Sequence, residues 1–341
     1  MYKPIYRITP HLLNLIDEIS ALRAWIGAAT VKVSWLPALQ KEAHSRAAHS
    51  STAIEGNPLT LHQVKAVARG EKVGAHIDHE KEVINYLKAV VWIKKNTRLK
   101  INEKNLLNLH KILSLGLLSE DKCGKYKQKQ NYVIDEKGIR IYTPPNPNET
   151  PRLVGELIKW LNLVETQKLH PILICAIAHH RLVSIHPFSD GNGRLSRALS
   201  TWVLYRHGFD NQHIFSLDEF FAGNRRMYYL KLQQARELDD NLSCWIEYVA
   251  EGVLNTLKDV KKRIEGLHIS SKTDISLSSR QEELLRILRD HRHLKVAELQ
   301  KILKVTRARV NQLITPLISA KLVVKEGESK ATRYGLANSA R

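Results

Sequence analysis

The sequence predicts a mainly α-helical protein with one β-hairpin and a small second domain near its C-terminal end. Apolar residues recur at helical spacing over most of the 341 residues. Residues 124–151 differ, because two short strand-like runs flank a Gly-containing turn and several prolines follow them. A polar, Ser-rich segment at 262–278 predicts a linker, and helix-start signals begin again at Ser279.

The composition is that of an ordinary globular protein, with 43% hydrophobic and 26% charged residues. We expect no membrane partner, since no apolar run has spanning length and acids stand where a signal peptide would be apolar. Three widely spaced cysteines predict neither a disulfide framework nor a zinc site and indicate a reducing cytoplasm. The net charge of +19 is spread along the chain, with +8 in residues 269–341, and indicates affinity for anions in general.

We expect residues 1–100 to form an N-terminal helical region. The spacing predicts a helix over residues 11–27 and a second helix that follows Pro37 and stops at Gly56. Thr60 then begins a third helix, with Gln63 at the reciprocal capping-box position.

Residues 101–261 are expected to form the core domain. Helical spacing continues to residue 120 after a break at 70–76, and we interpret His110 as a packed residue of one of these helices. The strand-like runs then predict a hairpin over 131–143. An unpaired hairpin edge can accept a peptide as a further strand, and an ordinary surface hairpin is the alternative.

Two helices over residues 152–184 follow the prolines. The adjacent His179 and His180 point to different faces of the second helix, which predicts packing or hydrogen bonding rather than a metal pair. Beyond residue 208 we expect a loop that reaches Phe221 and then two more helices.

The C-terminal residues 279–341 predict three short helices and a β-hairpin, which resembles a winged helix-turn-helix domain. Ser279 and Glu282 have capping-box spacing at the first helix, and Pro316 should kink the third. The third helix carries side chains suited to phosphate and base-edge contacts, so DNA and protein are alternative partners. These side chains belong to Arg307, Arg309, Asn311 and Gln312.

The stretch HPFSDGNGRLSR, residues 186–197, has the composition of a phosphate site. Gly191, Asn192 and Gly193 allow the backbone to approach an anion and to turn N–H groups toward it. The apolar-periodic run that follows predicts a helix ending at Gly208. The two glycines would therefore lie at a helix N-terminus, where phosphate is favoured.

Four side chains of this stretch predict chemistry on the phosphates of a nucleotide. Arg194 and Arg197 share one helix face and can converge on one ligand. Asp190 can reach a divalent cation that bridges phosphates. His186 precedes Pro187, which disfavours helical geometry and leaves the imidazole in a loop, where it can take a proton from an attacking hydroxyl.

The same stretch resembles the signature of the Fic family, H-x-F-x-[DE]-G-N-G-R-x-x-R, and meets every fixed position. The resemblance implies a helical Fic bundle that transfers AMP from ATP to a protein hydroxyl. His186 would be the base, Asp190 the Mg²⁺ (or Mn²⁺) ligand, and the glycines with both arginines the phosphate ligands. The hairpin would be the flap on which the protein target docks, although Lys127 stands where many members have arginine.

A second string, Ser51 to Gly56, resembles the family's inhibitory motif [ST]-x-x-x-E-[GN]. The resemblance implies that Glu55 pairs with Arg197 and removes the cation that should orient the γ-phosphate of ATP. Tyr229 belongs to a stretch resembling the family's YYxxL helix, which lines the adenine side of the nucleotide.

The sequence leaves two other functions open. The same site could remove AMP from modified proteins, with Glu55 activating water. The chain could also be a DNA-binding regulator whose Fic core senses nucleotide. The intact Gly193 disfavours the related phosphotransferase branch of the family, which has a lysine-containing version of this motif. The sequence also allows a homo-oligomer.

Overall fold

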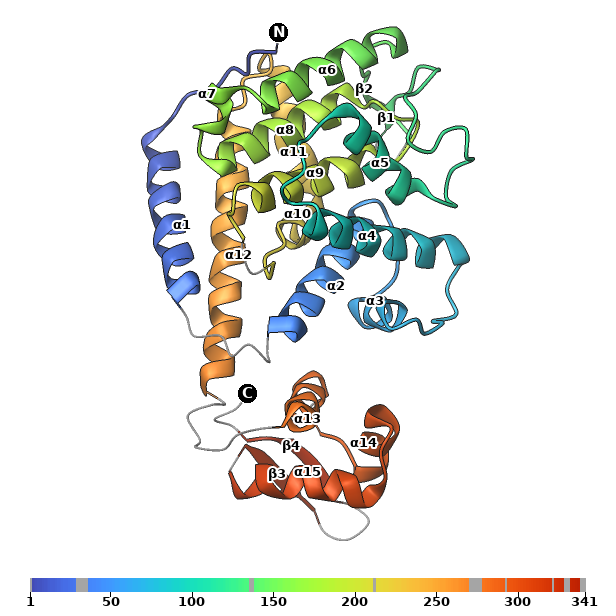
Figure 1. Cartoon of the computed structure of the whole chain (residues 1–341), viewed down its shortest axis with the longest axis vertical. Coiled ribbons are helices and arrows are strands. Elements are labelled where there is room, and N and C mark those ends of the chain that lie inside the picture. The colour runs from blue at the N-terminus through green and yellow to red at the C-terminus, as the bar shows by residue number, and fades with distance from the viewer. Residues whose placement is uncertain are drawn as a thin grey trace. The chain divides into compact units, whose positions relative to one another are not determined.

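The computed structural model describes residues 2–28, 36–134, 138–210, 213–269, 278–291, 293–320, 322–327 and 332–337. The chain divides into two compact units, with the boundary at residue 258 inside the last long helix of the larger unit. The larger unit is almost entirely helical, as the periodicity predicts (Figure 1).

The N-terminal region of the larger unit confirms the predicted helices and their end signals. Thr60 accepts a hydrogen bond from the Gln63 backbone, and both halves of the capping box form. Gly56 has a φ of +97°, a left-handed conformation that favours glycine after a helix. The helices are α1 (Pro10–Ala28), α2 (Leu36–Ile54), α3 (Leu61–Ala68), α4 (Ile77–Lys95) and α5 (Glu103–Ser114).

The rest of this unit contains the hairpin and a second set of helices. Strands β1 and β2 pair antiparallel, as predicted, while turn residues 135–137 lie outside the described residues. The elements are β1 (Val133–Ile134), β2 (Arg140–Tyr142), η1 (Pro147–Glu149), α6 (Thr150–Leu161), α7 (Val164–Gln167), α8 (Pro171–Ile185), α9 (Asn192–Arg206), α10 (Asp218–Gly223), α11 (Arg225–Glu237) and α12 (Ser243–Ile269).

Helices α8 and α9 form the centre of the unit and pack on each other. Nearly every side chain of α8 is buried, so the helix has no polar face. Helix α2 packs against α4 and α10, and α4 also contacts α9. The string containing Ser51 and Glu55 is thereby brought to the start of α9, far from it in sequence.

Two boundaries predicted from the sequence are wrong. The segment expected to be a loop up to Phe221 contains α10, which covers part of α2. Helix α12 runs to Ile269, so the first residues of the expected linker at 262–278 are helical. The helix continues because Leu257, Val260 and Ile264 keep helical spacing and are buried. Residues 270–277 lie outside the described part of the chain.

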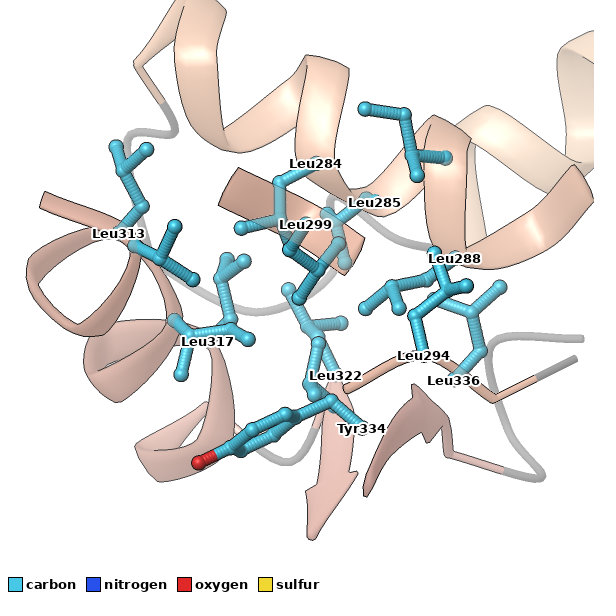
Figure 2. Packing of buried hydrophobic residues seen from close by; sticks show 14 of the residues in the cluster. Leu284, Leu285, Leu288, Leu294, Leu299, Leu313, Leu317, Leu322, Tyr334 and Leu336 are labelled. Atoms are coloured by element: carbon cyan, nitrogen blue, oxygen red, sulfur yellow. The ribbon is translucent and has the colours of Figure 1, made fainter. Parts of the chain in front are cut away.

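Besides the end of α12 after residue 258, the described residues of the smaller unit form three helices and a two-stranded antiparallel hairpin. Its core is a compact cluster of leucine side chains with Tyr334 (Figure 2). The capping box of the first helix is one residue earlier than predicted, because Ser278 and Gln281 form it. The third helix continues through Pro316. The elements are α13 (Ser279–Asp290), α14 (Val296–Leu303), α15 (Arg307–Ser319), β3 (Val323–Glu326) and β4 (Arg333–Leu336).

Candidate functional site

The loop between α8 and α9 carries the signature residues, and both of its ends have left-handed backbone. Helix α8 ends at Ile185, and His186 has a φ of +51° and a ψ of +56°. Gly191 has a φ of +79° and is the N-cap residue of α9. The predicted helix end at His186 and the predicted glycines at a helix N-terminus are therefore confirmed.

The imidazole of His186 is arranged to accept a proton at Nε2. Its Nδ1 lies 3.2 Å from the carbonyl oxygen of Val183. Because a carbonyl can only accept, Nδ1 carries the hydrogen and Nε2 keeps its lone pair. Burial, together with the charges of Lys127 and Arg236, lowers the pKa of His186 to about 4, although the Val183 carbonyl opposes the shift. The side chain is therefore neutral at neutral pH.

Asn192 fixes the loop with its side chain. The amide oxygen accepts a hydrogen bond from the Phe188 backbone N–H at 2.9 Å, and the amide nitrogen donates to the Phe188 carbonyl at 2.8 Å. The resemblance implies that Asn192 is a phosphate ligand. Because its side chain is paired within the loop, it can bind a phosphate only through its backbone N–H, which is one of the unpaired donors of the first helical turn.

His110, which the sequence indicated as a packed helix residue, is buried and also supports the signature loop. Its Nδ1 accepts from the Gly124 backbone N–H at 3.0 Å, so its Nε2 carries the hydrogen that faces the Asp190 carbonyl at 3.0 Å. The ring stacks on Phe188 with centroids 3.7 Å apart. Burial lowers the pKa of His110 to about 4, which keeps this neutral tautomer.

Lys127 and Asn131 attach the segment before β1 to the same loop. The Lys127 backbone donates to the Pro187 carbonyl at 2.9 Å, and its ammonium donates to Asn131 Oδ1 at 2.8 Å. Asn131 in turn donates to the Phe188 carbonyl at 2.8 Å. Burial lowers the pKa of Lys127 to about 8. The hairpin is therefore connected directly to the residue next to His186.

The two arginines of the signature lie at the start of α9, as predicted, and both are buried. Arg197 donates from Nη2 to Glu55 Oε1 at 2.5 Å and to the Ser51 carbonyl at 2.9 Å, and from Nε to Ser51 Oγ at 2.7 Å. Its Nη1 has no hydrogen-bond partner within the described residues and lies beside Gly193. A buried guanidinium N–H is therefore directed at the N-terminus of α9.

Gly193 leaves space for the Glu55 carboxylate at this point. A Cβ built on Gly193 would overlap Glu55 Oε1 and approach Arg197 Nη1 to 3.2 Å. A side chain at this position would force the Glu55 carboxylate to move, and its absence also gives an anion access to the backbone. The ion pair of Glu55 with Arg197 that the resemblance implies is present in the structure.

Asp218 is a second acidic partner of Arg197 that the sequence did not indicate. It begins α10, its side chain is 3% exposed, and its Oδ1 lies 3.7 Å from Arg197 Nε. The Tyr86 hydroxyl donates to the same oxygen at 2.9 Å. Burial lowers the pKa of Arg197, but the charge of Glu55 raises it above its usual range, with smaller contributions in the same direction from Tyr228, Tyr86 and Asp218.

Asp190 could be one ligand of a metal ion whose other ligands come from a bound molecule or water. Its side chain is 64% exposed and bonds Arg194 Nη2 through one oxygen at 3.2 Å. Within the described ranges, no three His, Cys, Asp or Glu side chains form a metal-binding group. A single exposed carboxylate fits Mg²⁺ held mainly by phosphates and water, which is how this ion usually binds nucleotides.

Tyr229 of α11 lies at the edge of this site. Its hydroxyl donates to the Ile54 carbonyl at 3.4 Å, and the Arg225 guanidinium lies over its ring. Burial and then the Glu55 charge raise the pKa of Tyr229. The neighbouring Tyr228 is buried and bonds His179 at 2.9 Å, while the other nitrogen of His179 faces Ser200 Oγ. The prediction of hydrogen bonding for His179 is confirmed.

Comparisons with known proteins find a matching family model and named relatives. Residues 100–204 match the family model described as Fic/DOC family. The chain is 31% identical to a protein adenylyltransferase Fic of Drosophila willistoni, over 73% of this chain and 49% of that protein. It is 32% identical to the protein of the same name from Drosophila mojavensis, over 73% and 48%. The chain thus spans about half the length of these curated relatives.

Solved structures are similar over larger parts of the fold. A Fic family protein from Desulfovibrio desulfuricans aligns with a TM-score of 0.70 and 25% identity, covering 99% of each chain. Fic-1 from C. elegans aligns with a TM-score of 0.63 and 25% identity, over 74% of this chain and 72% of that one. Among the residues the structure describes, no helix has both the length and the apolar character needed to cross a membrane.

Proposed function

Because residues 100–204 match the Fic/DOC family model, we propose that this protein is an adenylyltransferase that transfers AMP from ATP to a hydroxyl of a protein Tyr, Thr or Ser, its own chain included. The observation that carries the proposal is the position of His186. Its Nε2 lone pair lies in the loop that leads into the N-terminus of α9, where Gly193 and a buried Arg197 N–H make an anion site. The names of the curated relatives support the same activity.

The proposed reaction is a displacement at the α-phosphorus of ATP. His186 Nε2 takes the proton of the protein hydroxyl, and the hydroxyl oxygen forms a bond to the α-phosphorus. The bond between that phosphorus and the oxygen bridging to the β-phosphate breaks, and pyrophosphate leaves. Arg194, Arg197 and the N–H groups of α9 stabilise the phosphate charge. ATP would bring Mg²⁺, and Asp190 would be its protein ligand.

We further propose that Glu55 inhibits this reaction in the resting protein. The Glu55 carboxylate occupies Arg197 and fills the space above Gly193, both of which a γ-phosphate would need. ATP bound beside Glu55 would be held in a posture unsuited to in-line attack. Residues 1–100 would then be a regulatory region for the core at 101–261, and the hairpin at 131–143 would be the flap on which the target docks.

Intact-mass spectrometry after incubation with Mg²⁺ and ATP tests the proposed activity. We expect an added AMP on the Glu55→Gly variant and little on the wild type, because the substitution frees Arg197 for the γ-phosphate. The Glu55→Gly/His186→Ala variant should gain none. If wild type and Glu55→Gly are modified equally, Glu55 does not inhibit. If neither gains mass, a pre-modified protein should be tested for AMP removal, the alternative activity of the same site.

We propose that the smaller unit is a winged helix domain that binds duplex DNA. Helix α15 exposes Arg307, Arg309, Asn311 and Gln312, a set suited to phosphates and base edges. The alternative, a protein partner for this unit, is an outcome of the test. Three free cysteines support our placement of the whole chain in a reducing cytoplasm.

Salt-dependent binding of duplex DNA tests the role of the smaller unit. We expect Arg307→Ala and Arg309→Ala each to lower the affinity and to reduce the slope of log K against log salt by about 1, because each loses a phosphate contact. Arg286→Ala, an exposed arginine of α13, is the control and should leave the slope unchanged. Equal binding by all three variants and the wild type would contradict the DNA interface.

A further inference from the structure

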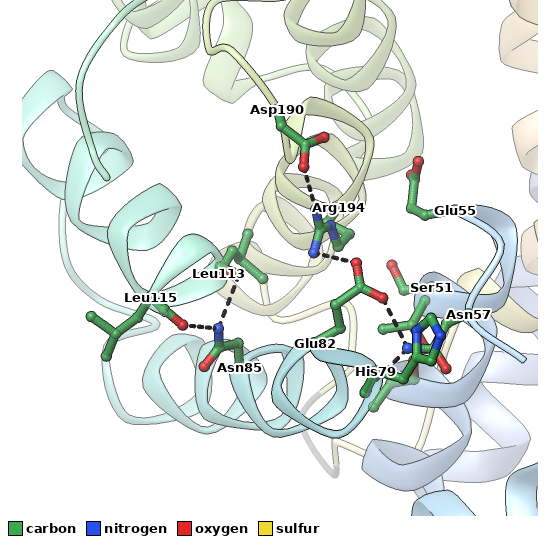
Figure 3. Close-up of polar contacts among 12 residues, drawn as sticks. Ser51, Glu55, Asn57, His79, Glu82, Asn85, Leu113, Leu115, Asp190 and Arg194 are labelled. Carbon is green, nitrogen blue, oxygen red and sulfur yellow. Dashed lines mark hydrogen bonds and ion pairs between the residues drawn. The ribbon is translucent and has the colours of Figure 1, made fainter. Parts of the chain in front are cut away.

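Glu82 of α4 joins two parts of the site that are far apart in sequence (Figure 3). Its Oε1 accepts a hydrogen bond from Arg194 Nη1 at 2.8 Å, and its Oε2 accepts one from Asn57 Nδ2 at 2.8 Å. The Glu82 side chain is only 18% exposed, so both bonds form in a largely water-free environment. No sequence motif pointed to this residue.

The first of these bonds fixes the direction of Arg194. The Arg194 side chain is 5% exposed and its other terminal nitrogen, Nη2, donates to Asp190 at 3.2 Å. A guanidinium held by an acid at each end of its planar fork has one orientation, and this one places it beside the N-terminus of α9. The hydrogen bond from Arg194 to Glu82 is shorter than the one to Asp190, and Glu82 is the better buried of the two acids.

The second bond fixes the turn that follows Glu55. Asn57 is buried, and its amide nitrogen also donates to the His79 carbonyl at 3.0 Å. Its amide oxygen accepts from the Leu59 backbone at 3.1 Å, and its own backbone N–H donates to the Thr52 carbonyl at 3.1 Å. Asn57 therefore attaches the end of α2 to α4, two residues after Glu55.

We propose that Glu82 is a positioning residue with two tasks, an inference that rests on the function proposed above. Through Arg194 it orients a phosphate ligand for ATP. Through Asn57 it holds the turn that keeps Glu55 against Arg197. Each arginine of the signature is thus tied to the end of α2: Arg197 directly, by Ser51 and Glu55, and Arg194 through Glu82 and Asn57.

A substitution of Glu82 can separate the effect of its two hydrogen bonds from the effect of losing one negative charge on α4. A glutamine at this position has one acceptor oxygen and one NH₂ group, yet it faces two donors. Either Arg194 or Asn57 therefore loses its acceptor, and in both cases Arg194 loses the ionised partner that fixes its direction. Glu80→Gln removes the same charge from the same helix two residues away and serves as the matched control. Within the described ranges, the Glu80 side chain accepts a hydrogen bond from the Val73 backbone N–H and none from Arg194 or Asn57.

The first measurement uses the Glu55→Gly protein, in which the proposed inhibition is absent. We expect Glu82→Gln to raise the KM for ATP about tenfold with kcat changed less than threefold, because a phosphate ligand is misdirected while His186 is untouched. Glu80→Gln should change neither constant. Equal constants for Glu82→Gln and its parent, or an equal effect of Glu80→Gln, would overturn the assignment.

The second measurement tests the link to the turn. In the protein with Glu55 intact, Asn57→Ala should raise AMP incorporation at least threefold over wild type, since the turn is released. In the Glu55→Gly protein the same change should alter the rate less than twofold, which would also show that the variant folds. An Asn57→Ala protein as inactive as wild type, or equal losses in both backgrounds, would overturn this role.

Calorimetric titration with ATP distinguishes failure of this inference from failure of the proposed function. If the Glu55→Gly protein transfers no AMP, the proposed activity is wrong, and the inference is then decided by binding alone. Glu82→Gln should still weaken ATP binding about tenfold relative to Glu55→Gly, with Glu80→Gln unchanged. Unaltered ATP affinity in Glu82→Gln would refute the positioning role whatever reaction the site performs.

Discussion

Replacement of His186 should nearly abolish AMP transfer by the Glu55→Gly protein. A positioned general base contributes about 10²- to 10⁴-fold to a rate, so we expect a loss of this size in His186→Ala and in His186→Asn. The rate of AMP incorporation under single-turnover conditions, followed by intact mass, measures it. ATP affinity should change little, because the role proposed for His186 is to contact the attacking hydroxyl and not the phosphates of ATP.

The asparagine variant is the informative one, because it preserves the local structure. Asparagine tolerates the left-handed backbone that His186 adopts, and its amide NH₂ can replace Nδ1–H as donor to the Val183 carbonyl. It has no equivalent of the Nε2 lone pair. His62→Ala, which removes an exposed histidine of α3, is the control for loss of an imidazole. Retained transfer by His186→Asn would show that His186 is not the base.

The low pKa of His186 predicts an unusual pH dependence. Only the neutral imidazole can accept a proton, and burial lowers its pKa to about 4. The transfer rate of Glu55→Gly should therefore be flat from pH 8 to about pH 5.5 and fall only as the pH approaches 4. A histidine with an ordinary pKa would already have lost half its activity near pH 6.5. A midpoint there would contradict the structural account of His186.

The signature loop was predictable because it is local. His186 before Pro187, and glycines before an apolar-periodic run, specify a helix end and a helix start within a dozen residues. The pairing of Glu55 with Arg197 was not predictable from spacing, since 142 residues separate them. It followed only from the resemblance of two motifs to one family.

The supporting residues were missed because nothing in the chain near them indicates a partner. Asp218, Glu82 and His110 act on the signature through helices α10, α4 and α5, and the packing of those helices decides which side chains meet. Asp218 was the least accessible to prediction, because its segment was expected to be a loop. A helix of six residues has too few apolar repeats to show a period.

Replacement of Arg197 should destabilise the protein far more than replacement of Glu55. Arg197→Ala leaves Asp218 buried and without its cation, a loss that costs about 3–5 kcal/mol. For a unit of this size we expect the midpoint of thermal unfolding to fall by about 6–20 °C. Glu55→Gln removes the charge of a side chain that is 30% exposed and keeps an acceptor, so it should cost at most about 1 kcal/mol. Calorimetry of both variants compares them.

A third variant decides whether Asp218 causes the difference. If the cost of Arg197→Ala comes from the unpaired carboxylate of Asp218, then Arg197→Ala/Asp218→Asn should recover about 1–2 kcal/mol of the lost stability. The asparagine amide oxygen can still accept the hydrogen bond from Tyr86. Additive losses in the double variant would mean that packing, not the ion pair, is the cause. Recovery would show that Asp218 is the structural partner of Arg197. Glu55, more exposed and at the end of α2, would then be the partner that can leave when ATP binds.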